Sequence, residues 1–175
     1  RFKNKCTQPP VPELITKAWL DVYAATGDRR FYDAAKANVD QYVTADGEIL
    51  TYEPDKYNLD MICMGRTALR LFKATGEAKY EKACRRLIEQ IKGQPTTAEG
   101  GFWHKKLYPQ QMWLDGIYMA CPFLTEFAVT FGEMQWADLA AKQMKLIFEK
   151  SVPGRRCSIL PRCDVEEVQL PQELR

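Results

Sequence analysis

Apolar side chains recur every three or four positions along most of the chain, a spacing that is typical of amphipathic helices. The pattern occurs six times, separated by glycines or by loop-forming residues. We expect helices at 12–26, 28–44, 60–74, 77–92, 111–130 and 134–150. The segment 93–110 is rich in glycine, proline, threonine and aromatic residues, which predicts a long loop. Long loops in compact helical proteins are often functional.

The six predicted helices form three copies of one unit. Each copy has a glycine between its two helices, at Gly27, Gly76 or Gly132. An acidic residue directly follows each glycine, and an aromatic residue stands four positions after the glycine. These aromatic residues, which we expect in the hairpin cores, are Phe31, Tyr80 and Trp136. The repeat predicts an all-α fold of antiparallel hairpins at 12–44, 60–92 and 111–150, of the kind that stacks into solenoids or closes into an α/α toroid.

The helical pattern stops after Lys150. Residues 151–175 have no amphipathic period and contain three prolines, so we predict an irregular tail behind a helical domain at 1–150. Hydrophobic residues make up 46% of the chain and charged residues 27%, which is ordinary for a globular protein and argues against disorder.

The charge distribution excludes two classes of partner. The net charge is +2, and acidic and basic residues are mixed along the chain, so we expect no nucleic-acid face and no membrane-binding surface. No apolar run is long enough to span a membrane, and no signal-peptide segment follows Arg1. We therefore expect a cytoplasmic protein. The sequence leaves the oligomeric state open.

Six cysteines are present, and none forms a C-x-x-C pair. Cys63, Cys84 and Cys121 fall among apolar residues of predicted helices, which indicates buried, reduced thiols rather than a disulfide framework. The chain has a single histidine and no close cysteine pair, so we expect no metal site.

The segment 100–123 carries the strongest chemical signal. Asp115 lies there in an apolar run, and the only formal charges between Met112 and Phe131 are Asp115 and Glu126. A buried, unpaired carboxylate is costly, so a functional reason is expected. Asp60 stands at the same place in the preceding repeat, within one residue. If the hairpins stack in register, both carboxylates lie on one rim, an arrangement suited to acid/base chemistry.

The long loop brings further candidates to that rim. Trp103, His104 and Trp113 are flat, amphipathic side chains of the sort that line sugar clefts, and Lys105 or Lys106 supplies a positive charge for a substrate carboxylate. Structural alternatives stay open for each residue. Asp115 could be a first-turn acid at a helix dipole, Asp60 an N-cap, and His104 a loop histidine bonded to backbone. Trp103 could serve packing as well as binding.

The stretch 99–123, read as EGGFWHKKLYPQQMWLDGIYMACPF, resembles the signature of glycoside hydrolase family 105, the unsaturated rhamnogalacturonyl hydrolases. Residues 57–69, YNLDMICMGRTAL, resemble the family segment that carries its other important aspartate. The related family 88, the unsaturated glucuronyl hydrolases, is a poorer match. The resemblance implies an (α/α)6 barrel of six hairpins. The three predicted hairpins would make about half of that toroid, so we expect a fragment.

The resemblance also implies a reaction. The substrate is an oligosaccharide with a 4,5-unsaturated galacturonyl residue linked to rhamnose, and the reaction hydrates the enol-ether double bond. Asp115 would be the general acid/base, and Asp60 would hold the substrate and water. His104, Trp113 and Met112 would lie at the sugar subsite. Neither a metal nor an organic cofactor is expected.

Three functions remain in competition on the sequence. The first is a hydrolase of unsaturated rhamnogalacturonan oligosaccharides, and a close variant acts on unsaturated glucuronides. The second is a helical-repeat binding module whose concave face holds a peptide or partner. The third is a truncated homologue that folds without catalysing. The paired aspartates, together with aromatic residues and His104 on the same rim, favour the enzyme, because a peptide-binding solenoid has no need of them.

Overall fold

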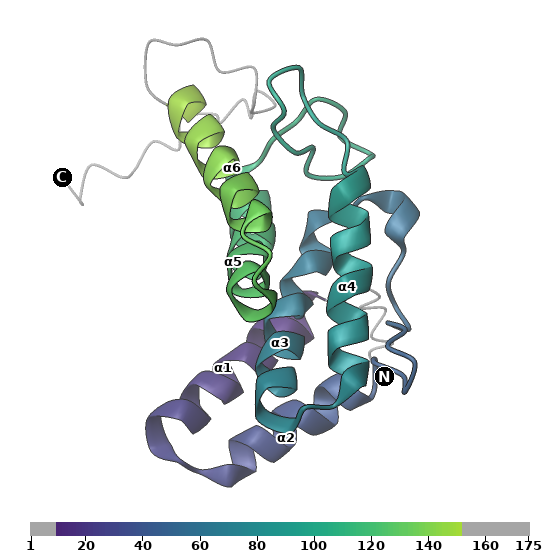
Figure 1. Cartoon of the computed structure of the whole chain (residues 1–175), viewed down its shortest axis with the longest axis vertical. Coiled ribbons are helices and arrows are strands. Elements are labelled where there is room, and N and C mark those ends of the chain that lie inside the picture. The colour runs from purple at the N-terminus through teal and green to yellow at the C-terminus, as the bar shows by residue number, and fades with distance from the viewer. Residues whose placement is uncertain (1–9, 152–175) are drawn as a thin grey trace, which may run out of the picture.

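The computed structural model describes residues 10–151 of the chain, with side chains from 14 to 150. It contains six α-helices and two short 3₁₀ helices (Figure 1). The α-helices are α1 (Pro10–Thr26), α2 (Arg29–Asp40), α3 (Met64–Thr75), α4 (Ala78–Gly93), α5 (Leu114–Phe131) and α6 (Gln135–Ser151). The 3₁₀ helices are η1 (Pro54–Lys56) and η2 (Leu59–Cys63). The expected tail lies outside the described residues, except at its first residue, where α6 ends.

The helices pack as three antiparallel hairpins, α1 with α2, α3 with α4 and α5 with α6. The first helices of the hairpins are neighbours, since α1 contacts α3 and α3 contacts α5. The predicted all-α fold is confirmed. Of the helices between Pro10 and Ser151, none has the length and apolar character that crossing a membrane requires.

Each hairpin turns at its repeat glycine. Gly27, Gly76 and Gly132 have φ angles of +73°, +70° and +72°, in the left-handed region that favours glycine. The N–H of Gly76 donates to the carbonyl of Phe72, which closes the last turn of α3. The repeat found in the sequence therefore corresponds to one backbone conformation used three times.

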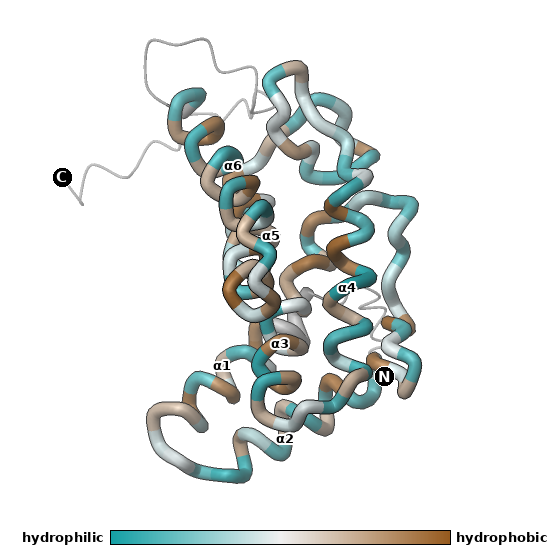
Figure 2. The backbone as a smooth tube through the Cα atoms, in the orientation of Figure 1, coloured by the Kyte–Doolittle hydropathy of each residue, from teal (hydrophilic) through white to brown (hydrophobic). Residues whose placement is uncertain are grey.

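A continuous apolar core lies between the hairpins. Tyr80 and Trp136 are buried in it as predicted, but Phe31 is only half-buried and Tyr32 takes the core position of the first hairpin. The prediction for Phe31 is therefore wrong. The reason is the helical period of α2, which aligns Tyr32 with buried Ala35 and Val39. In Figure 2 brown and teal stretches alternate along the tube of α4, as expected of a helix with one buried face.

The described cysteines are all core residues. Cys63, Cys84 and Cys121 are buried, as predicted. Burial raises the pKa of the Cys84 and Cys121 thiols, so both stay protonated and unreactive. Cys6, Cys157 and Cys163 lie outside the described residues.

Candidate active site

Asp60 lies in η2, a tight turn that precedes α3, rather than at the start of an α-helix as predicted. The side chain of Asn58 caps this turn, because its Oδ1 accepts a hydrogen bond of 3.0 Å from the N–H of Asp60. The structure therefore assigns the cap to Asn58 instead of Asp60. The Asp60 carboxylate is left available for the site, and its side chain is 14% exposed.

Asp115 lies in the first turn of α5, and its side chain is 55% exposed. The expectation that the Asp115 carboxylate is buried in apolar surroundings is therefore wrong. The helical period is the reason: Gly116, Met119 and Ala120 point into the core, whereas Asp115 and Tyr118 share the exposed side of the helix. Asp115 is open to solvent, and hence to a ligand.

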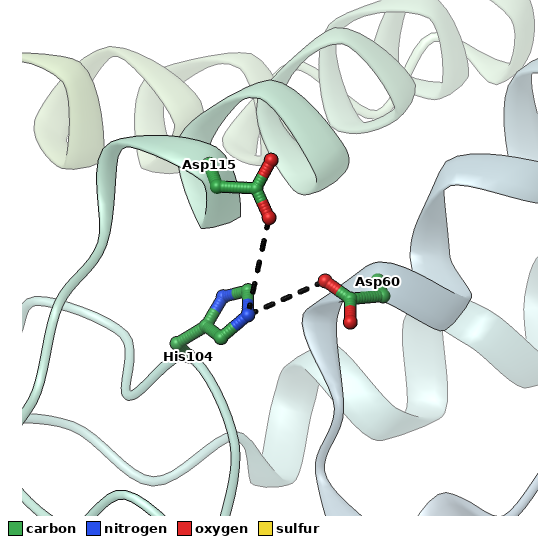
Figure 3. A group of neighbouring side chains, drawn as sticks. All are labelled: Asp60, His104 and Asp115. Carbon is green, nitrogen blue, oxygen red and sulfur yellow. Dashed lines mark ion pairs between the residues drawn. The ribbon is translucent and has the colours of Figure 1, made fainter. Parts of the chain in front are cut away.

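His104 lies between the two carboxylates (Figure 3). Its Nε2 is 3.3 Å from Oδ1 of Asp60 and 4.0 Å from Oδ2 of Asp115, and its side chain is 1% exposed. The N–H of His104 donates to the carbonyl of Gln111, and its carbonyl accepts from the N–H of Leu59. These two backbone bonds fix the residue between the loop and η2. The structure thus brings together three residues that are 44 and 11 positions apart in the sequence.

Burial of the imidazole favours its neutral form. Burial lowers the pKa of His104 below its ordinary value, and the neighbouring Lys105 lowers it further, although Asp60 and Asp115 raise it. The Nζ of Lys105 is 2.7 Å from Oδ2 of Asp60. Lys105 therefore compensates the less exposed carboxylate, and the side chain of Asp115 remains the more accessible of the two.

Aromatic rings cover one side of the group. The Trp113 indole stacks on His104, with ring centroids 4.4 Å apart and planes 10° apart, and on Tyr108 at 4.9 Å and 19°. Its Nε1 donates to Oε1 of Gln111. Trp113 is half-buried, so part of its surface faces solvent beside the imidazole. Trp103 is also half-buried, and its Nε1 has no hydrogen-bond partner within the described part of the chain.

Met112 does not join this group. Its side chain is 2% exposed and packs with Ile147 in a small separate cluster. It lines a cavity of about 120 Å³ between the long loop and the end of α6, and none of Asp60, His104 and Asp115 lines that cavity. The backbone at Trp113 is extended, which sends consecutive side chains to opposite sides. Since Trp113 faces the imidazole, Met112 is turned away, contrary to the expected sugar contact.

Two residues that shape the site were missed from the sequence. Asn58 caps η2, and Gly116 gives the imidazole room: a Cβ on Gly116 would lie 3.0 Å from Nδ1 of His104. The available signals were an asparagine two positions before Asp60 and a glycine directly after Asp115.

The three side chains could also be considered as metal ligands. One oxygen of each aspartate and one nitrogen of His104 lie within 4.8 Å of one another. Nitrogen and carboxylate oxygens suit several divalent ions. However, the Lys105 ammonium already pairs with Asp60, and its positive charge opposes a second cation. The donor set therefore fits a metal poorly, and the sequence prediction that none is used stays a prediction.

Comparisons with known proteins bear on the family and the fold of the chain. The profile of Glycosyl Hydrolase Family 88 matches residues 14–152. The fold is similar to a solved structure from C. acetobutylicum ATCC 824, a glycoside hydrolase from family 105, with a TM-score of 0.76 and 36% sequence identity. The match covers 79% of this chain and 38% of that one, so the chain corresponds to less than half the length of that enzyme. The chain belongs to glycosyl hydrolase family 88 and has part of the all-α fold of a family 105 enzyme.

Proposed function

We propose that the site hydrates the enol-ether double bond of a 4,5-unsaturated uronyl residue at the non-reducing end of an oligosaccharide. The observation that carries the proposal is the position of the buried imidazole of His104 between Asp60 and Asp115. The two aspartates are unequal, since one is paired with Lys105 and the other is open to solvent. Two carboxylates in different surroundings can take different roles in acid/base chemistry on one substrate.

In this reaction Asp115 donates a proton to C4 of the unsaturated ring, and a C4–H bond forms as the double bond breaks. A water molecule then adds its oxygen to C5 and returns a proton to the Asp115 carboxylate. The product at C5 is a hemiketal, which opens by itself and releases the saccharide. The proton count balances, so Asp115 ends in the form in which it began, and one water is consumed.

The other residues hold the ring and the water. Asp60, fixed by Lys105, accepts hydrogen bonds from a sugar hydroxyl or from the attacking water. His104 in its neutral form has one N–H donor, and Trp113 offers an apolar face to the sugar ring. Lys105 also supplies a positive charge near the uronyl carboxylate. No organic cofactor has a role in this scheme, and the proposed partner is the oligosaccharide alone.

For the substrate we propose an unsaturated galacturonyl residue linked to rhamnose. The support is the motif in 99–123 and the similarity to an enzyme of family 105. A second candidate is an unsaturated glucuronide, which the match to the family 88 profile favours. Both contain the same enol ether and carboxylate, so Asp60, His104 and Asp115 would act alike on either.

The test presents both substrates to the purified chain. Unsaturated rhamnogalacturonan disaccharide and an unsaturated glucuronyl disaccharide are incubated separately, and the products are identified by mass spectrometry. The proposal expects free rhamnose, together with an open-chain keto-uronate, from the first substrate at the higher rate. Faster turnover of the glucuronide would favour the second candidate. If the chain is folded and both substrates remain intact, whether or not they bind, hydration by Asp60, His104 and Asp115 is contradicted.

A further inference from the structure

Two glutamines lie buried at the carboxyl end of α4, where only apolar residues are otherwise expected. Gln90 is 4% exposed and Gln94 is 6% exposed. Gln90 lies in the last turn of α4 and Gln94 directly follows the helix, and Nε2 of Gln90 donates to Oε1 of Gln94 at 3.1 Å. A buried amide is costly unless its hydrogen bonds are made, so the partners of these groups are informative.

Gln94 connects the two segments that carry the site. Its Nε2 donates to the carbonyl of Tyr57 and to the carbonyl of Trp103, each at 2.9 Å. Tyr57 is three residues before Asp60, and Trp103 directly precedes His104. One amide group therefore uses both of its N–H donors to join the long loop to residues 57–63, which are called the η2 segment below because they lead into η2 and include it.

Gln90 supports the same junction from the preceding turn of α4. Its Nε2 also lies 3.3 Å from the carbonyl of Asn58, and its Oε1 accepts a hydrogen bond of 2.8 Å from the hydroxyl of Tyr52. The side chain of Asn58 in turn caps the turn that holds Asp60. The hydrogen bonds thus run from the core helix through both glutamines to the backbone on either side of the site.

We propose that Gln94, supported by Gln90, is a positioning residue that sets the distance between His104 and Asp60. The separation of 3.3 Å between these side chains depends on two segments that are far apart in the sequence, and Gln94 binds both of them. This inference goes beyond the proposed hydration reaction but rests on it for its effect on catalysis. Its effect on the imidazole is independent of any substrate.

The first test uses the fact that His104 is the only histidine in the chain, so its ring nitrogens give unambiguous NMR signals. The variant Gln94→Met keeps the length of the side chain and removes both donors. We expect displaced ring-nitrogen signals and a pKa of His104 that moves towards its ordinary value. A folded variant with unchanged signals and an unchanged titration would overturn the proposal.

The matched control is Gln143→Met. Gln143 is fully buried and also makes two hydrogen bonds to the long loop, by accepting from the N–H of Phe102 and donating to the carbonyl of Gly100, but it does not bind the η2 segment. We expect a comparable fall in Tm for both variants and displaced His104 signals only for Gln94→Met. Equal displacement in both would assign the effect to general loosening of the loop and overturn the role of Gln94.

If Gln94→Met does not fold, Gln90→Met decides the question, because it removes the support and leaves the donors of Gln94. It should displace the His104 signals in the same direction by a smaller amount, and no displacement would contradict the proposal.

The catalytic experiment measures turnover of the unsaturated disaccharide, for which Gln94→Met should lower kcat about a hundredfold. Lack of turnover by the parent chain would refute the proposed function, and the NMR result would still decide the positioning role.

Discussion

Asp60 and Asp115 occupy equivalent places in two repeats, yet their surroundings differ. Asp60 is mostly buried and bound by Lys105, whereas more than half of the Asp115 side chain is exposed. The imidazole between them is buried and favours its neutral form. The difference comes from the loop that enters before α5, since it delivers His104 and Lys105 to one carboxylate more closely than to the other.

At the level of single residues, Gly116 is expected to control the position of the imidazole. In Gly116→Ala the added Cβ would lie 3.0 Å from Nδ1 of His104 and 3.0 Å from Cδ1 of Leu59, so the ring must shift. We predict displaced His104 NMR signals and a fall in turnover of more than about tenfold. The higher helix propensity of alanine, about 1 kcal/mol, offsets part of the overpacking, so stability should change little.

The control for this variant is Gly65→Ala on α3. Its Cβ would overlap the ring of Phe123 in the core, away from the imidazole. It should lose about 1–3 kcal/mol of unfolding free energy and keep the His104 signals in place. If Gly116→Ala leaves both the signals and the turnover unchanged, the close approach of the ring to α5 has no functional role.

At the level of elements, the sequence predicted the helices well and the segments between them less well. The repeat glycines and the burial of Tyr80 and Cys84 in α4 followed from the spacing of residues. The turn at Asp60 did not, because its form depends on the Asn58 cap and on a hydrogen bond from Leu59 to His104, 45 residues away. The start of the fifth helix was also predicted wrongly, since an extended backbone at Trp113 replaces the helix expected from residue 111.

The residues of the candidate site could be predicted from the sequence, but their contacts and distances could not. Helical register placed Asp60 and Asp115 at one rim, and the loop was expected to join them. The partner of Lys105 and the hydrogen bonds of Gln94 depend on long-range packing that no local pattern encodes.

The hairpin turns give a prediction at the same scale. Gly76 has a φ angle of +70°, and a Cβ placed there would meet no atom within 4 Å. Gly76→Ala should therefore cost about 1 kcal/mol through backbone strain alone. Urea unfolding would measure this loss, with Lys73→Ala at an exposed position of the same helix end as the control. A loss no larger than that of the control would show that the left-handed conformation is not required.

For the whole molecule, the single histidine predicts how stability varies with pH. The folded-state pKa of His104 lies below its ordinary value of about 6.5, so the unfolded chain binds more protons at mildly acidic pH. The corresponding contribution to stability is complete above about pH 6.5 and is lost as pH falls through the lowered folded-state pKa. The free energy of unfolding should therefore decrease below about pH 6.5.

Urea unfolding of the parent chain and of His104→Gln, between about pH 5 and pH 7, checks this expectation. The carboxylates with lowered pKa, such as Asp40, titrate at lower pH and do not interfere. The variant should lack the decrease that the parent shows. If the free energy of unfolding varied with pH in the same way for both proteins, His104 would have the same pKa in the folded and the unfolded chain.

An ultraviolet assay tests whether Asp115 transfers the proton in the proposed hydration reaction. The unsaturated disaccharide absorbs through its conjugated double bond, and hydration removes that absorbance. The parent chain is compared with Asp115→Asn, after circular dichroism has confirmed equal helicity and cooperative melting. We predict loss of absorbance with the parent and a rate about 10²–10⁴-fold lower with the variant. Equal rates, or no loss of absorbance with a folded parent chain, would contradict it.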